Sequence, residues 1–311
     1  MINILCATDD NYVPYCGIML TSLFENNTQE QFDIYIMTEG LNSNNQNMLN
    51  DLVQSHQSNI QYTIVNSNSL KDCPIRTGDH VSLATYYRLL APKLLPDKVT
   101  KILYLDCDMI INDSIKALWD TDISNFAIGA VIDESLNYPD KFDRLGYSAS
   151  KGYFNAGMLL INLDYWRMHN VMERCFKCIQ TMPDKLLFHD QDTLNVVLQD
   201  EKKYLPVTYN LQTGFLYQIT PLSDSLKKEV LASVACPTVI HYTGPSKPWL
   251  ERSQHPYASF YQYYKHLSSW SNFPDIKCSF SSKLLYYRNQ LIWKLGIKKR
   301  PQTYIIPKQY K

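Results

Sequence analysis

The sequence lacks the features that place a protein in a membrane or export it. No apolar run in its 311 residues reaches the ~18 residues that a membrane-spanning helix needs. The chain opens on apolar residues, but no basic region precedes them as in a secretory signal peptide. These observations predict a cytoplasmic protein without a signal peptide.

Glycine-rich phosphate-binding motifs are also missing. The chain has only 10 glycines, with no Gly-x-Gly-x-x-Gly after the first predicted strand and no Gly-x-x-x-x-Gly-Lys-Ser/Thr anywhere. Such loops hold dinucleotides or triphosphates through their backbone amides. If this chain binds a phosphate, a metal ion and side chains must therefore hold it.

The eight cysteines lack the spacing of a disulfide framework. Several lie in apolar runs, so we expect reduced, mostly buried thiols. The one Cys-x-x-Cys pair, Cys175 and Cys178, falls in a helical pattern without a second pair to complete a zinc site. We predict no metal or redox role for it.

Acidic residues are absent from the C-terminal segment 277–311. The whole chain is formally neutral, with 30 basic and 30 acidic residues, but this segment has nine basic and no acidic side chains, so residues 1–276 carry a net charge of −9. Apolar residues make up 45% of the chain and charged residues 19%, as in ordinary globular proteins. The length predicts one large α/β domain or two smaller ones, with an electrostatically separate tail.

The most informative segment is 101–112, where an apolar run ends in Asp106 and Asp108. The run indicates a buried strand. On an extended backbone residues i and i+2 face the same way, so both carboxylates can point at one spot while Cys107 points away. Paired carboxylates repel unless a cation lies between them, and a hard divalent ion that bridges to phosphate satisfies such a pair. The alternative is an ordinary polar turn.

Predicted strands and helices alternate along the first 65 residues. A short strand that runs into a polar turn is predicted within 2–12, further strands at 32–37 and 59–65, and helices at 15–24 and about 42–57. Such alternation predicts a mostly parallel sheet, which binds ligands at the carboxyl ends of its strands. The polar residues 9–12 and the Asp106–Asp108 segment both follow such ends. Capping of the first helix by an aspartate at 9 or 10 is the simpler alternative.

Further candidate residues are polar side chains in apolar surroundings. Arg88 lies in a predicted helix at 82–95, where it is either solvated or directed at a carboxylate or phosphate. Asp133 ends a predicted strand. Asn155 precedes another predicted strand and is either structural or directed at a ligand hydroxyl.

Two later segments complete the set. Asp190 and Gln191 begin an amphipathic helix, where acids also serve the helix dipole. His241 ends a predicted strand, and Gly244 and Lys247 follow it in a loop. This order suits a third metal ligand beside a phosphate-binding loop, although an isolated histidine is more often structural.

Taken together, these motifs resemble those of glycosyltransferase family 8, especially the bacterial lipopolysaccharide α-galactosyl- and α-glucosyltransferases. The resemblance covers roughly residues 1–265, with motifs in the expected order at 7–12, 86–88, 103–108, 153–157, 190–192 and 241–247. It implies an α/β GT-A fold with a mixed, mostly parallel central sheet flanked by helices. We expect this domain to span 1–268, followed by a basic, helical C-terminal extension at 269–311.

The resemblance also implies a metal and a donor. Asp106, Asp108 and His241 match the family's ligands for Mn²⁺, with Mg²⁺ as the alternative, and the metal bridges the diphosphate of a UDP-hexose. Lys247 and the backbone near Gly244 add positive potential there. The remaining matches to donor-binding positions are Ala7, Asp9, Asn11 and Tyr12 for the nucleoside, Arg88, Asp133, Asn155, Asp190 and Gln191 for the hexose, and Cys107 between the metal ligands.

Family members retain the anomeric configuration and make α-linkages. Retention can use a protein nucleophile, sought at Asp190 or Gln191, or attack by the acceptor on the face that UDP leaves. We favour the second route, with Gln191 stabilising an oxocarbenium-like centre. The donor stays open because galactose and glucose differ at one hydroxyl, and Asp133, Asn155 and Asp190 could accept either sugar. The acceptor is expected to be lipopolysaccharide or another saccharide or lipid-linked glycan, and it stays open because loops 137–150 and 211–222 carry no readable code.

The composition of the C-terminal extension predicts its partner. A basic, aromatic segment such as 277–311 suits the anionic inner leaflet of the membrane, so we predict peripheral membrane association. A solvated tail is the alternative. No nucleic-acid partner is expected, because no nucleic-acid-binding motif accompanies the charge.

A non-catalytic UDP-sugar-binding protein would be expected to have lost a metal ligand or Gln191. A phosphatase with Asp-x-Asp would carry it on the first strand with Thr, not Ile110, two residues later.

Overall fold

A computed structural model gives the arrangement of the chain. It describes residues 1–75, 82–135, 140–218 and 222–277, and beyond these 284, 287–288, 290–292, 294–295, 297, 301–304 and 306. Parts of the two loops that we expect to contact the acceptor, and much of the predicted C-terminal helix, therefore lie outside the described residues.

Seven strands form the central sheet, in the order β3-β2-β1-β4-β7-β6-β8. Their bounds are β1 Ile2–Ala7, β2 Phe32–Thr38, β3 Asn59–Ile64, β4 Lys101–Leu105, β6 Ile128–Ile132, β7 Phe154–Asn162 and β8 Lys202–Tyr204. Neighbouring strands are parallel except at β7, which is antiparallel to both β4 and β6. The prediction of a mixed, mostly parallel sheet is confirmed.

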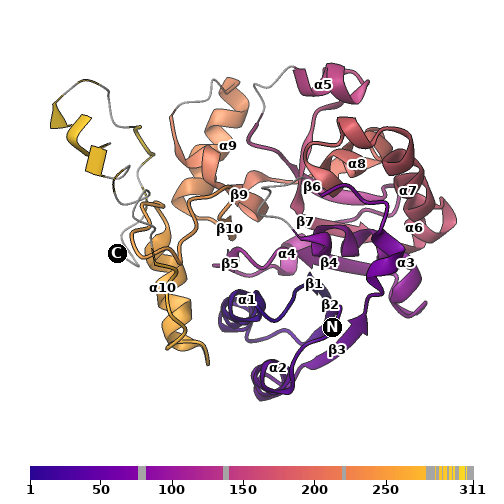
Figure 1. Cartoon of the computed structure of the whole chain (residues 1–311), viewed down its shortest axis with the longest axis horizontal. Helices are drawn as coiled ribbons and strands as arrows, with labels where there is room; N and C mark the ends of the chain where they lie inside the picture. The colour runs from indigo at the N-terminus through magenta and orange to yellow at the C-terminus, as the bar shows by residue number, and fades with distance from the viewer. Residues whose placement is uncertain are drawn as a thin grey trace.

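Helices cover both faces of this sheet (Figure 1). The α-helices are α1 Val13–Glu25, α2 Ser43–Ser55, α3 Ala91–Leu94, α4 Lys116–Trp119, α5 Asp140–Leu145, α6 Leu163–Met168, α7 Val171–Thr181, α8 His189–Val197, α9 Asp224–Ala235 and α10 Ala258–Leu267. Short 3₁₀-helices are η1 Ser67–Leu70, η2 Leu83–Leu90, η3 Ala149–Lys151, η4 Pro183–Lys185, η5 Val207–Asn210 and η6 Thr213–Leu216.

The central strand β4 shows why the sheet is covered on both sides. Leu103 and Leu105 pack into the apolar cluster that contains α1 and α10. Ile102 and Tyr104 point the other way, into the cluster that contains α7 and α8. Because alternate residues of a strand face opposite sides, a run that is apolar at every position requires a core on each face.

A second, three-stranded sheet lies beside the main one. It has the order β5-β10-β9, with β5 at Met109–Ile111, β9 at Leu211–Gln212 and β10 at Val239–His241. The chain passes from β4 in the main sheet to β5 in the small one within residues 106–108. This crossing segment is therefore held by both sheets.

Two local predictions differ from the structure. The segment 82–95, expected as one helix, is η2 followed by the short α3, because Pro92 has no N–H to donate to Arg88 O; that carbonyl accepts from Ala91 N–H, an i→i+3 bond. The first helix has Tyr12 at its N-cap position, without a side-chain cap. Asp9 Oδ1 instead accepts the N–H groups of Asn11 and Tyr12, each at 2.9 Å, in the turn before the helix.

The chain's last described residues return to the main domain. Thr303 forms a bridge with Tyr217, Tyr304 N–H donates to Leu216 O at 3.0 Å, and Ile306 is buried. Of the expected basic extension, Leu284, Tyr287, Leu291 and Leu295 are described and exposed. Among the described residues, none of the helices combines the length and the apolar character that crossing a bilayer requires.

Candidate active site

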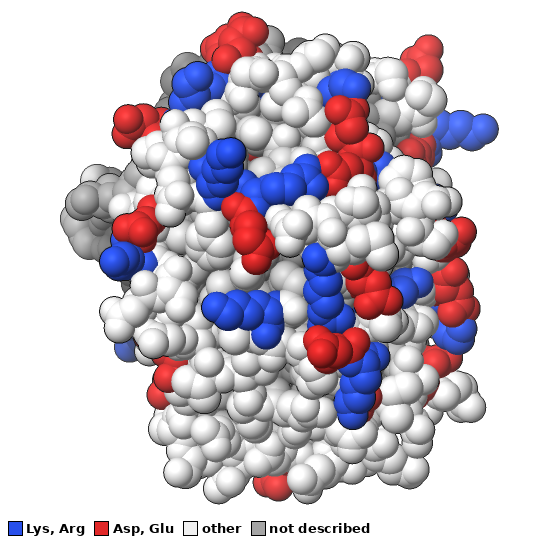
Figure 2. All heavy atoms as spheres, turned by 90° about the vertical axis from the view of Figure 1, so that its right-hand side faces the viewer, with Lys and Arg blue, Asp and Glu red and all other residues white. Residues whose placement is uncertain are grey.

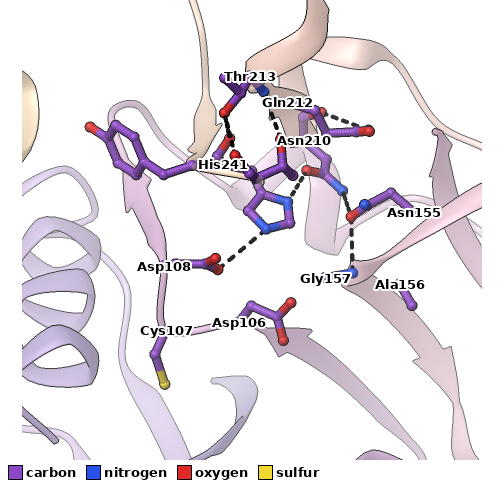
Figure 3. A network of polar contacts seen from close by, with 12 residues as sticks. Asp106, Cys107, Asp108, Asn155, Ala156, Gly157, Asn210, Gln212, Thr213 and His241 are labelled. Carbon is purple, nitrogen blue, oxygen red and sulfur yellow. Dashed lines mark hydrogen bonds and ion pairs between the residues drawn. The ribbon is translucent and has the colours of Figure 1, made fainter. Parts of the chain in front are cut away.

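Three predicted metal ligands meet where the two sheets join. Asp106 and Asp108 follow β4, and β5 pairs antiparallel with β10, so that His241 lies opposite Met109. One ligand atom from each of Asp106, Asp108 and His241 lies within 4.8 Å of the others. Figure 3 shows the imidazole directed at the two carboxylates, while the Cys107 side chain points the opposite way. The Cys107 thiol lies 3.4 Å from Ala7 O.

The residues around this cluster fit a divalent cation. Asp108 Oδ1 is buried and has no hydrogen-bond partner among the described residues, although His241 Nε2 lies 3.3 Å away. A buried carboxylate oxygen without a donor is costly and is relieved by a metal ion. Two carboxylates and one imidazole form a donor set that divalent cations accept.

Gly157 leaves room for these ligands. A Cβ added there would lie 2.4 Å from His241 Cε1 and 2.7 Å from Asp106 Oδ2. Gly157 ends the 153–157 segment that matches the family, but the sequence does not mark it as a site residue. A glycine within an otherwise apolar strand is a signal for such a close approach.

Arg88 lies between two carboxylates rather than in solvent. It is 3% exposed, and its guanidinium lies 2.9 Å from Asp106 Oδ1 and 3.0 Å from Asp190 Oδ2. Burial alone would lower the pKa of Arg88, but the charges of Asp106 and Asp190 raise it above its ordinary value. Tyr104 also donates to Asp106 Oδ1, at 2.7 Å. The alternative that Arg88 is a solvated surface residue is excluded.

Lys247 belongs to the same cluster. Its ammonium pairs with Asp108 Oδ2 and donates to Tyr242 O at 2.6 Å. Burial alone would raise the pKa of Asp108, but the charge of Lys247 holds it well below its ordinary value. Gly244, with φ of +72°, provides the left-handed turn between His241 and Lys247.

Three of the five residues predicted to hold the hexose, Asp133, Asn155 and Gln191, are joined by hydrogen bonds. Gln191 Nε2 donates to Asp133 Oδ2 at 3.2 Å, and Gln191 Oε1 accepts Ala156 N–H at 2.9 Å. Asn155 Nδ2 donates to the same Asp133 oxygen at 3.2 Å. All of these side chains lie beside the metal cluster, at the ends of β6, β7 and α8.

Asp190 and Asp192 have different environments. Asp192 accepts Phe188 N–H and Tyr153 O–H and pairs with Arg144, so it holds the start of α8. Asp190 faces the site, where it pairs with Arg88 and accepts a hydrogen bond from Thr85. Burial raises the pKa of Asp190, although Arg88 and Thr85 oppose the shift.

The expected nucleoside residues lie at the end of β1 and in the turn before α1. Tyr12 is 40% exposed, and burial of its hydroxyl, together with the charge of Asp108, raises its pKa to about 12. Asp9 holds the turn that precedes α1. Asp10, by contrast, accepts hydrogen bonds from Asn42 and Asn45, which join this turn to α2.

Two residues at this site carried no sequence signal. Asn210, in η5, is fully buried and lies 2.9 Å from His241 Nδ1. Glu134 accepts hydrogen bonds from Gly214 N–H and from the Thr243 hydroxyl, joining the end of β6 to the loop after β10. Neither occurs in a recognisable motif, and both reach the site only through tertiary contacts.

Comparison with known proteins identifies relatives of the chain. A family model described as glycosyl transferase family 8 matches residues 3–253. A putative glycosyltransferase of Haemophilus influenzae is 31% identical over 82% of this chain and 74% of its own length. The lipopolysaccharide 1,3-galactosyltransferase of Salmonella typhimurium is 27% identical over 87% of this chain and 79% of its own length. The crystal structure of galactosyltransferase LgtC with donor and acceptor sugar analogues matches with a TM-score of 0.79 and 27% identity, over 86% of this chain and 96% of that one.

Proposed function

This chain belongs to glycosyltransferase family 8, and we propose that it moves a hexose from a UDP-hexose to a saccharide acceptor with retention of configuration. The donor sugar is galactose or glucose, and the acceptor is lipopolysaccharide or another cell-surface glycan. The proposal rests chiefly on one observation: Asp106, Asp108 and His241 converge beside the Arg88–Asp190–Gln191 group. The named activities of the relatives support the same reaction class.

The metal cluster would hold the diphosphate. A divalent ion there acts as a Lewis acid that stabilises the departing UDP. Two carboxylates and an imidazole favour Mn²⁺ over Mg²⁺. Lys247, released from part of its pairing with Asp108, would place its ammonium on a phosphate oxygen, and the backbone near Gly244 would approach the same group.

The nucleoside would lie along the end of β1. Ala7, Asp9 and Asn11 would contact the uridine and ribose, and the Tyr12 ring would stack on uracil. The partial exposure of Tyr12 supports this role, because one face of the ring is accessible to a ligand. Cys107 would contribute through its backbone, since its thiol is directed at Ala7.

The hexose would lie among Arg88, Asp133, Asn155, Asp190 and Gln191. Asp190 Oδ1 accepts a hydrogen bond from Thr85, whereas Asp190 Oδ2 forms an ion pair with Arg88 at 3.0 Å but no hydrogen bond among the described residues. The ion pair holds this carboxylate on Arg88, which supports attack by the acceptor over a covalent intermediate. In that route the acceptor oxygen bonds to the anomeric carbon as the bond to UDP breaks on the same face, and its proton passes to the leaving phosphate. Gln191 would stabilise the positive charge of the sugar ring.

Two measurements test this proposal. Proton NMR of the first-formed product should show the α-anomer, because retention is required; a β-product would contradict the stereochemical assignment. Mass spectrometry of enzyme quenched during turnover should detect no sugar on Asp190 or Gln191. A glycosylated peptide at either position would establish the covalent route instead.

We also propose that the enzyme is cytoplasmic and that residues 277–311 attach it to the anionic inner leaflet. The exposed Leu284, Tyr287, Leu291 and Leu295 recur at helical spacing among the basic residues. Figure 2 shows basic and acidic side chains interspersed on the face that carries α6 and α7, the right-hand side of Figure 1. Each basic residue near an anionic surface contributes about 1 kcal/mol.

Cosedimentation with lipid vesicles tests the membrane proposal. The variant K294S/K298S/K299S/R300S removes four charges but leaves unchanged Thr303 and Tyr304, which pair with Tyr217 and Leu216. It should bind vesicles of phosphatidylglycerol less than the unaltered chain does, with the difference lost in vesicles of phosphatidylcholine. Equal sedimentation of both proteins with the anionic vesicles would favour a solvated tail.

A further inference from the structure

His241 can bind a metal only if the correct ring nitrogen carries its proton. The ring is 4% exposed, with Nε2 directed at Asp108 and Nδ1 placed 2.9 Å from Asn210 Oδ1 (Figure 3). A neutral imidazole has one N–H and one lone pair, and the partner of one nitrogen decides which nitrogen keeps the lone pair. The surroundings of Asn210 therefore decide whether Nε2 is a ligand.

The hydrogen-bond chain behind His241 begins with groups whose roles are unambiguous. Gly157 N–H, which can only donate, lies 3.0 Å from Asn155 Oδ1. At the other end of the same amide, Asn155 Nδ2 lies 3.2 Å from Asp133 Oδ2. Asp133 also accepts Ser135 N–H at 2.9 Å and lies 4.0 Å from Lys141 Nζ, so it faces donors on both of its oxygens. The Asn155 amide can therefore adopt only one orientation.

That orientation determines the next two links. Because Asn155 presents its oxygen, Asn210 must present Nδ2 to it, at 2.9 Å. Asn210 Oδ1 then faces His241 Nδ1, and an amide oxygen can only accept. The Nδ1 atom of His241 must carry the proton, which leaves the Nε2 lone pair facing Asp106 and Asp108.

We propose that Asn210 is a positioning residue that holds His241 in the Nδ1–H tautomer and so keeps Nε2 free to bind the metal. This inference rests on the proposed metal site, but the tautomer itself is a property of the metal-free protein. The rival arrangement has Nε2–H directed at Asp108 Oδ1, 3.3 Å away. It would leave the lone pair of His241 Nδ1 facing Asn210 Oδ1 at 2.9 Å, so that two acceptors would meet at the shorter of the two distances.

The same chain contains an internal control of opposite tautomer. His255 is also buried, but its Nδ1 accepts Tyr257 N–H at 3.2 Å, so its proton must lie on Nε2, 3.1 Å from Thr213 Oγ1. Burial, together with the charge of Lys247, lowers the pKa of His255 to about 3 and keeps the ring neutral. The two histidines therefore provide reference signals for both forms.

Nitrogen-15 NMR of the metal-free protein at alkaline pH tests the tautomer. Protonated and lone-pair ring nitrogens have well-separated shifts, and the variants His241→Gln and His255→Gln assign the two residues. We expect a protonated Nδ1 in His241 and a protonated Nε2 in His255. A protonated Nε2 in His241 would overturn the proposal, and this test needs no variant of Asn210.

Two substitutions then test Asn210 itself. Asn210→Leu is of similar size but removes the acceptor, so His241 should populate both tautomers and the Kd for Mn²⁺ should rise about 10- to 100-fold. Asn210→Asp keeps the acceptor, so the Nδ1–H signal should persist. Circular dichroism reports whether each variant folds. If Asn210→Leu leaves both the tautomer and the Mn²⁺ affinity unchanged, Asn210 has no positioning role.

Calorimetric titration of the unaltered chain with Mn²⁺ tests the metal site separately from the tautomer of His241. If it binds no Mn²⁺ while His241 shows the Nδ1–H form, the proposed metal site fails but the tautomer assignment stands. If it binds Mn²⁺ while His241 shows the Nε2–H form, the role of Asn210 fails but the metal site stands.

Discussion

The substitution Gly157→Ala should damage the metal site more than it damages the fold. The new Cβ would lie 2.4 Å from His241 Cε1, whereas ordinary contacts begin at 3.4 Å, so the ring must retreat by about 1 Å. It cannot do so freely, because Nδ1 is held by Asn210. Asp106, the other neighbour, is held by Arg88 and Tyr104.

The expected magnitudes follow from this geometry. A displacement of about 1 Å at a positioned catalytic group can reduce turnover about 100-fold. Overpacking by one methyl group destabilises a core by about 1–3 kcal/mol. We therefore expect weaker Mn²⁺ binding by calorimetry and strongly reduced UDP release, in a protein that still folds.

Gly129→Ala is a matched control on the neighbouring strand β6. Its Cβ would lie 3.0 Å from Leu205 Cδ1, the flexible end of a side chain that contacts no metal ligand. Urea denaturation should show a loss of stability for both variants, but only Gly157→Ala should lose Mn²⁺ affinity. Mn²⁺ affinity that stays unchanged in Gly157→Ala would refute the close approach of His241 and Asp106 to this position.

Three other substitutions have distinct expected results. Asp108→Asn should preserve the circular dichroism spectrum but abolish Mn²⁺-dependent turnover, and substantial remaining activity would contradict its role as a ligand. Gly17→Ala places a Cβ 2.0 Å from the Trp270 ring, so the free energy of unfolding should fall by about 1–3 kcal/mol while the Kd for Mn²⁺ is unchanged; an unaltered urea midpoint would argue against this packing. Burial lowers the pKa of Lys202 from 10.5 to about 8 in the folded protein. Between pH 8 and pH 10.5 the unfolded chain therefore binds more protons at this residue than the folded protein does, and the free energy of unfolding should rise with pH. Lys202→Met should remove that rise in urea titrations at a series of pH values, and an unchanged slope would exclude Lys202 as its source.

The sequence predicted those features that depend on local periodicity. The apolar run of β4 and the alternation of side chains on an extended backbone were enough to place Asp106 and Asp108 on one side and Cys107 on the other. Alternating strands and helices likewise predicted the parallel part of the sheet. The antiparallel insertion of β7 could not be read from its continuous apolar pattern, because such a run suits any doubly covered strand.

Features that depend on distant contacts were not accessible from local patterns. His241 reaches the carboxylates because β10 pairs with β5, a contact between segments more than a hundred residues apart. The family resemblance suggested this meeting, but no property of the segment itself required it. Asn210 was missed because a buried asparagine in an unremarkable sequence gives no sign of which partner it will meet.

The most direct test of the central claim is UDP release from a panel of UDP-sugars, measured with Mn²⁺ and with a chelator, without added acceptor. We predict slow hydrolysis of UDP-galactose or UDP-glucose that requires Mn²⁺ and stops when the chelator is added. Mn²⁺-dependent UDP binding without turnover of any donor would leave a strict acceptor requirement or a non-catalytic binding protein. If no UDP-sugar is hydrolysed and UDP does not bind in the presence of Mn²⁺, the proposed donor site is contradicted.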